Sequence, residues 1–222
     1  MGDMRIHSGD HTLAADLVTP TTPSGGGLLF VHGYASSRRR QTLRAEDVAK
    51  RLGHTGLAVD LSGHGDSPGD LRQCTRQDHL RDVVAAYDAL AAEGVERIGV
   101  CAASYGAYLS CLLLSERPVR KLLLRAPALY IDTDGDDPES RQHLRGLIDT
   151  NAALANLAAF DGDTLVLESE HDEVISHDSI EAYRHAARHG THRVLAGAKH
   201  ALTDDASNTA FLTEIVDWFT GL

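Results

Sequence analysis

The chain has 222 residues, of which 21 are lysine or arginine and 32 are aspartate or glutamate, so its formal net charge is −11. This length favours a single domain over residues 1–222 with a sizeable core. Hydrophobic residues make up 42% and charged residues 24%, as in an ordinary globular protein. The acidic balance argues against nucleic acid and anionic membranes as partners, and no apolar stretch approaches the 18 residues of a membrane span.

The three cysteines form an odd set without paired spacing, which implies no disulfide framework and favours a reducing cytoplasm. Cys101 and Cys111 fall in apolar segments, where we expect them to pack as buried residues. The N-terminal residues lack the apolar segment of a signal peptide. These features predict a cytoplasmic monomer or homodimer.

Strand-like and helix-like patterns alternate along the chain. This alternation predicts βαβ units and an α/β fold, with a mostly parallel twisted sheet and helices on both faces. The predicted strands are about 12–18, 27–32, 56–61, 97–103, 119–125, 163–168 and 192–196. The predicted helices are 42–53, 77–92, a helix from residue 105 to about 115, and helices near 178–189 and 206–220.

Residues 128–161 break the alternation. They contain an acidic loop from Asp132 to Glu139 and a helical pattern over about 140–158. Because this segment follows a strand, we interpret it as a small lid or cap insertion. One further surface helix packed on the sheet explains the pattern equally well.

The most informative segment surrounds Ser104. An apolar strand starting at Arg97 ends at this serine, and a helical apolar run follows at once. Ala102 and Gly106 stand two positions away on each side, where a tight corner leaves no room for larger side chains. This layout is typical of a nucleophile elbow, which lifts a serine hydroxyl out of the fold. The alternative is a serine that caps an ordinary helix.

Two later segments could supply the base and the acid that a serine nucleophile needs. A strand runs into the acidic turn around Asp172, and His200 lies in a small-residue loop after a short strand. Ser104, then Asp172, then His200 is the order expected for an elbow on a parallel sheet. All three follow predicted strands, and such sheets collect reactive residues beyond the carboxyl ends of their strands.

With these segments, and with His32-Gly33-Tyr34 after another apolar strand, the chain resembles the α/β-hydrolase superfamily over residues 26–220. It looks most like the small esterases and serine-aminopeptidase-like members. The resemblance implies a catalytic triad of Ser104, Asp172 and His200, with an oxyanion hole formed by the backbone N–H groups of Tyr34 and Tyr105.

Around the acid, the family usually has Gly three positions earlier, where this chain has Ser169. Glu170 and Glu173 are the alternative acids, and Asp172 is favoured because it occupies the family's turn position.

The predicted function is the hydrolysis of a small-molecule carboxylic ester through an acyl-enzyme, without metal or other cofactor. We expect a mixed substrate pocket that takes a small or medium acyl group or an aromatic ester. The candidate substrate-binding residues are Tyr34, Tyr105, Leu129, Tyr130 and Leu144. A thioesterase or an aminopeptidase-like amidase would use the same triad, and a non-catalytic binding protein on the hydrolase scaffold is the remaining alternative.

Two charged features have competing interpretations. The 13 histidines include no zinc-binding motif, and we interpret His185, His189 and His192 as a solvated face rather than a metal site. The basic run Arg38–Arg40 lies beside the predicted site. We interpret it as a solvated loop, although it could instead attract anionic substrates.

Overall fold

The computed structural model describes residues 2–130 and 151–222. In this part of the chain, eight strands form one sheet in the order β1-β2-β4-β3-β5-β6-β7-β8. β1 and β2 pair antiparallel, as do β2 and β4, and the other pairs are parallel. This confirms the predicted, mostly parallel sheet. The strands are β1 (Gly2–Ser8), β2 (His11–Val18), β3 (Gly26–Val31), β4 (Thr55–Val59), β5 (Arg97–Ala103), β6 (Lys121–Arg125), β7 (Asp163–His171) and β8 (His189–Lys199).

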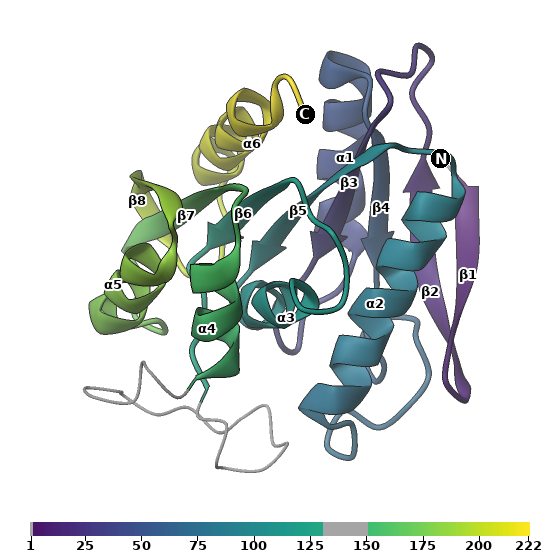
Figure 1. Ribbon diagram of the computed structural model, residues 1–222, viewed down its shortest axis with the longest axis horizontal. Coiled ribbons are helices and arrows are strands. Elements are labelled where there is room, and N and C mark those ends of the chain that lie inside the picture. Colours follow the sequence, from purple (N-terminus) through teal and green to yellow (C-terminus); the bar gives the residue numbers. More distant parts are fainter. Residues whose placement is uncertain (1, 131–150) are drawn as a thin grey trace.

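Helices cover both faces of the sheet, as expected (Figure 1). Every residue of β3 and β4 is buried, which explains their continuous apolar sequences. One face carries α1 (Arg39–Leu52) and α6 (Asp205–Phe219), which pack against each other. The other face carries α2 (Arg76–Ala92), α3 (Tyr105–Leu113), α4 (Ala152–Ala159) and α5 (His177–Ala186) in a contiguous row. Two hydrophobic cores result, one on each side of the sheet.

Local sequence signals explain where several helices begin and end. Thr75 and Asp78 form a reciprocal capping box at the start of α2. Gly53 ends α1 in the left-handed conformation at φ 70°, which glycine adopts without steric cost. In the described residues, no helix combines the length and the apolar character needed to cross a membrane.

Two parts of the chain, the N-terminal strand and the segment predicted as a lid, need comment against the elements predicted from the sequence. The strand β1 is missing from the predicted set, although Met4 and Ile6 alternate with the exposed side chains of Asp3, Arg5 and His7. α4 occupies the end of the segment predicted as a lid and packs against α3 and α5. The remainder of that segment, 131–150, lies outside the described residues, so the lid stays a prediction.

Candidate active site

Ser104 occupies a strained corner between β5 and α3. Its backbone has φ 52° and ψ −119°, a conformation that residues other than glycine rarely adopt. Its side chain makes no capping hydrogen bond to α3, unlike the capping serine of an ordinary helix. The Ser104 N–H donates to the carbonyl of Arg125 at 2.9 Å, which ties the corner to β6.

Gly106 shows why this corner needs a small residue. A Cβ atom at this position would lie 2.4 Å from the His32 carbonyl oxygen and 2.7 Å from that of Val31. Both contacts are with backbone, which cannot rotate away as a flexible side chain could. The small residue at position 106 is therefore required by the close approach of α3 to the end of β3.

His200 and Asp172 form a close pair in the loops after β8 and β7. The His200 Nδ1 lies 2.8 Å from one carboxylate oxygen of Asp172, whose side chain is only 7% exposed. The other oxygen accepts the N–H groups of Val174 and Ile175, each at 2.8 Å. Burial would raise the pKa of Asp172, but the hydrogen bonds from His200, Ile175 and Val174 outweigh burial and hold this pKa below its ordinary value. Asp172 is thus an ionised hydrogen-bond acceptor for His200.

The two alternative acids lie elsewhere. Glu170 is exposed, and its carboxylate accepts the Gly197 N–H at 2.6 Å. Glu173 is also exposed. Of the three acidic residues in this turn, Asp172 is the one that contacts His200.

Ser104 and His200 line the same cavity, which has a volume of about 360 Å³. Its walls are formed by α1, by the carboxyl ends of β5 and β6, and by the loops after β3 and β8. A molecule in this cavity can therefore contact the serine and the histidine together. The lining residues are Gly33, Tyr34, Ala35, Ser36, Ser37, Arg40, Gln41, Arg44, Ala103, Ser104, Arg125, His200, Ala201, Leu202 and Thr203.

The loop after β3 lies directly beside Ser104. A Cβ atom on Gly33 would be 3.3 Å from the Ser104 Cβ and 3.8 Å from its hydroxyl oxygen. Buried His32 holds this loop, because its Nδ1 lies 2.7 Å from the Gly33 carbonyl oxygen and its Nε2 accepts the Leu61 N–H at 3.1 Å. The backbone of Gly33 and Tyr34 is thereby fixed next to the first turn of α3.

A buried layer of histidines behind this loop was missed by sequence reasoning. His32, His64 and His79 come from separate segments, yet their rings contact one another at steep angles, with centroids 4.9 Å and 5.2 Å apart. The Nδ1 of His79 lies 2.8 Å from the hydroxyl of Tyr105, the residue after Ser104. Burial lowers the pKa of all three imidazoles, and that of His32 falls to about 4. His32 and His64 follow adjacent strands, which is the only signal that could have grouped them.

The predicted substrate-binding residues are not all found in the cavity. Tyr34 lines it. The side chains of Tyr105, Leu129 and Tyr130 are buried in the core and do not belong to its lining, because the aromatic rings pack against each other and against His79. Leu144 lies outside the described residues.

The three arginines of the basic run Arg38–Arg40 lie in different environments. Arg38 forms ion pairs with Asp16, Asp60 and Asp66, and only 12% of its side chain is exposed. Arg39 and Arg40 are both exposed, and Arg40 also lines the cavity. The interpretation of this run as a solvated loop is therefore wrong for Arg38.

Within the described residues, no group of three histidine, cysteine, aspartate or glutamate side chains could hold a metal ion. His192 instead lies 3.0 Å from Glu168, and His185 lies 3.5 Å from Glu181. Cys74, Cys101 and Cys111 are all free and buried, and burial raises the pKa of the Cys101 thiol to about 12. These thiols are packing residues, as expected for Cys101 and Cys111.

Comparison with known proteins identifies the family to which the chain belongs. The family model described as serine aminopeptidase S33 matches residues 22–147, more than half of the chain. A palmitoyl-protein thioesterase of cattle mitochondria, ABHD10, is 33% identical over 107 residues, which cover 48% of this chain and 34% of that protein. A carboxylesterase of Bacillus subtilis is 26% identical over 117 residues, or 52% of this chain and 47% of that protein. The match thus spans less than half the length of each of these relatives.

Solved structures agree over almost the whole chain. The esterase Est1E of Butyrivibrio proteoclasticus, solved with ferulic acid bound, superposes with a TM-score of 0.76 at 18% identity and covers 97% of this chain and 98% of that one. Mouse ABHD10 superposes with a TM-score of 0.73 at 17% identity, and the alignment covers 98% of both chains. These likenesses show the fold, and the family model shows the membership: the chain belongs to the serine aminopeptidase S33 family of the α/β-hydrolase superfamily.

Proposed function

We propose that the chain is a serine hydrolase that cleaves a carboxylic ester of a small or medium acyl or aromatic group through Ser104, His200 and Asp172. The single observation that carries this proposal is one cavity lined by a strained serine and by a histidine paired to a buried carboxylate. A histidine whose Nδ1–H donates to a carboxylate keeps its Nε2 as an acceptor for a serine proton.

The first half of the reaction forms an acyl-enzyme. The Ser104 oxygen attacks the carbonyl carbon of the ester, and the serine proton passes to His200. Asp172 stabilises the imidazolium that forms, because its ionised carboxylate faces the protonated ring. The tetrahedral intermediate then expels the alcohol, which takes the proton from His200. The second half repeats these steps with water, releasing the acid and restoring the serine.

The negative charge of the tetrahedral intermediate needs hydrogen-bond donors. The Tyr105 N–H at the start of α3 and the Tyr34 N–H in the loop beside Ser104 are the two groups we assign to this oxyanion hole. The close approach of Gly33 to Ser104 supports the assignment of the Tyr34 N–H, because it places this loop next to the serine. Each donor contributes about 3 kcal/mol of transition-state stabilisation.

A thioesterase is the second candidate, because several relatives carry that name. It would use the same triad with a thiolate as the leaving group. An amidase would likewise differ only in the leaving group.

A matched substrate series tests the reaction class. The same butyryl group is offered as an oxygen ester, a thioester and an anilide, and kcat/KM is measured for the wild type, Ser104→Ala and Ser37→Ala. We expect the oxygen ester to react fastest, Ser104→Ala to lose the activity by several orders of magnitude, and Ser37→Ala to retain it. Faster Ser104-dependent cleavage of the thioester would move the assignment to a thioesterase. Hydrolysis that survives in Ser104→Ala would overturn it.

A further inference from the structure

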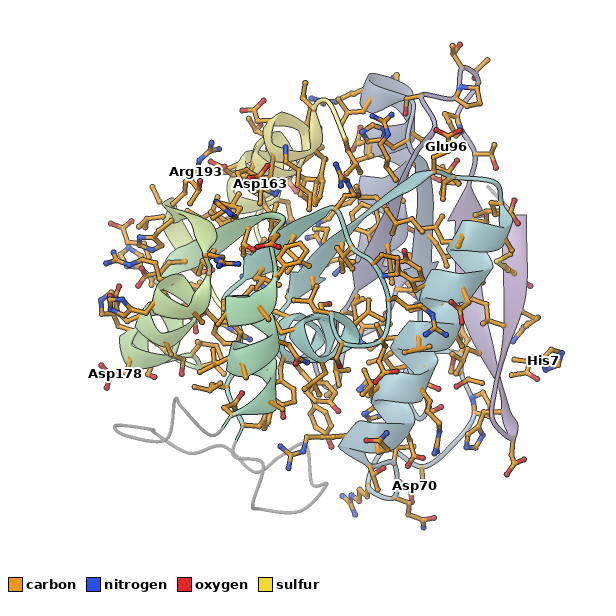
Figure 2. All side chains as sticks on the ribbon, in the orientation of Figure 1. His7, Asp70, Glu96, Asp163, Asp178 and Arg193 are labelled. Carbon is orange, nitrogen blue, oxygen red and sulfur yellow. The ribbon has the colours of Figure 1, made fainter. Side chains whose placement is uncertain are left out.

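The cavity beside Ser104 is lined by three arginines and by no carboxylate among the described lining residues. Arg40 and Arg44 project from the first turns of α1, and Arg125 ends β6 next to the strand that carries the serine. This concentration of positive charge contrasts with the net charge of −11 of the whole chain. Acidic side chains such as Asp70, Glu96 and Asp163 are exposed at the periphery instead (Figure 2).

The three arginines bind only neutral protein groups in the described part of the structure. Arg40 donates to the Leu202 carbonyl oxygen. Arg44 donates to the side-chain oxygens of Gln41 at 2.9 Å and Asn208 at 3.1 Å. Arg125 donates to the Ser169 hydroxyl and the His200 carbonyl oxygen, both at 2.9 Å. None of the three forms an ion pair within 4.0 Å of a described carboxylate.

Arg38, which directly precedes α1, is by contrast neutralised by carboxylates of the protein itself. It contacts three carboxylates, those of Asp16, Asp60 and Asp66, only two residues before Arg40. The guanidinium groups of the cavity thus differ from that of Arg38, which lies against carboxylates. No described carboxylate neutralises the three guanidinium groups of the cavity.

Arg125 is the most deeply buried of the three arginines. Only 7% of this residue is exposed, and its Nε has no hydrogen-bond partner among the described residues. Burial, together with the neighbouring charge of Arg44, lowers the pKa of its guanidinium to about 10, while Asp172 opposes the shift. The group is still cationic at neutral pH, and a buried cation without a counter-ion is costly. An anion in the cavity would offset that cost.

Ser169 explains how Arg125 is held in this position. Its hydroxyl is buried and accepts one arm of the guanidinium. The second arm donates to the carbonyl oxygen of His200, so Arg125 also braces the loop of the histidine. The serine that replaces the usual glycine at position 169 therefore has a structural partner in the cavity wall.

We infer that the substrate is an ester carrying an anionic oxygen group, a carboxylate or a phosphate, which Arg40, Arg44 and Arg125 bind beside Ser104. The guanidinium fork matches the oxygens of both groups and prefers them to neutral acceptors. This inference rests on the proposed function, because it names the substrate class of the same site.

The experiment compares anionic esters with neutral partners of nearly the same shape. The umbelliferyl monoester of adipic acid, with a free carboxylate on the acyl chain, is paired with its methyl ester. Butyryloxyethyl phosphate, with its charge on the alcohol side, is paired with its dimethyl phosphotriester. The readout is the ratio of kcat/KM for the anionic and neutral members of each pair. We expect a ratio well above one for at least one pair, and the pair that shows it identifies a carboxylate or a phosphate.

Arg44→Gln and Arg40→Gln test the origin of the ratio, and Arg39→Gln is the matched control. Arg39 is exposed on the same turn and does not line the cavity, so its loss removes the same charge without removing a contact. We expect Arg44→Gln or Arg40→Gln to lower the ratio by about 10- to 100-fold, as for a lost charged hydrogen bond, and Arg39→Gln to change it less than about twofold. These surface-reaching positions are chosen because Arg125 variants could fail to fold.

The possible failures are distinguishable. Ser104-dependent hydrolysis with ratios at or below one for both pairs would overturn the anion inference and leave the proposed function standing. A ratio that falls equally in Arg39→Gln would also overturn it, because long-range charge would then be the cause. Absence of Ser104-dependent hydrolysis for all four esters would overturn the proposed function itself.

Discussion

Ser104 shares its unusual backbone with two other described residues that are not glycine. Ala35 and Ala126 also have positive φ, at 53° and 44°. Ala35 lines the cavity, and Ala126 directly follows Arg125 in its wall. Such conformations cost of order 1–3 kcal/mol each and persist where the surrounding structure imposes them. Within the described residues, the positive-φ strain outside glycine is therefore concentrated around the proposed nucleophile.

At the same scale, Asp172 is the residue whose role is most sharply testable. Asp172→Asn keeps the shape of the side chain but removes the charge that faces His200. We expect kcat for an ester to fall by up to about 10⁴-fold, the loss seen for the acid of the serine-protease triad. Steady-state kinetics of Asp172→Asn, Glu170→Gln and Glu173→Gln provide the comparison. An equal or larger loss in either glutamate variant would place the acid elsewhere in the turn.

At the scale of elements, alternation along the sequence was sufficient for seven of the strands. The signal is strongest for β3, β4, β5 and β6, because buried parallel strands read as continuous apolar runs. The strand β1 is an exposed edge whose alternating residues form a weak signal, and it was missed. The start of α1 at Arg39 was placed three residues late, because its first turn is polar and faces the cavity.

The residues of the candidate site likewise include some that the sequence could predict and some that it could not. Ser104, Asp172 and His200 each follow a strand, so topology alone gathers them at one edge of the sheet. Arg125 ends β6 and therefore carries the same signal, whereas Arg44 lies inside a helix and does not. Their meeting depends on how α1 packs against β3, β4 and α6, which is a property of the tertiary structure. Tyr105 and Tyr130 do not line the cavity for the complementary reason, because their large aromatic side chains are buried in the core.

At the scale of the whole molecule, the buried histidines make folding depend on pH. The folded pKa of His32, His64 and His79 lies below the value near 6.5 of an unfolded chain, because burial disfavours the charged imidazole. Below about pH 6.5 the unfolded state therefore binds more protons than the folded state. Stability is fully present above that pH and is lost as pH falls toward the folded values.

We expect the free energy of unfolding to decrease between about pH 6.5 and pH 4, with His32 alone accounting for roughly 3 kcal/mol. Urea unfolding across this range measures the slope, which gives the number of protons taken up on unfolding. His64→Phe removes one of the titrating groups and should reduce that number by up to one. Stability that is constant or rises as the pH falls to 4 would contradict the account, as would an unchanged slope in His64→Phe.

The central claim is that Ser104 is a nucleophile activated by His200, and the most direct measurement is the site of covalent labelling by a fluorophosphonate. Ser36 and Ser37 line the same cavity and are internal controls, because a merely accessible serine should not react. We predict that mass spectrometry of the digested protein finds the label on Ser104, that Ser37→Ala labels as fast as the wild type, and that His200→Ala labels at least about a hundredfold more slowly. Labelling at Ser36 or Ser37, or labelling of Ser104 at the same rate in His200→Ala, would contradict the claim.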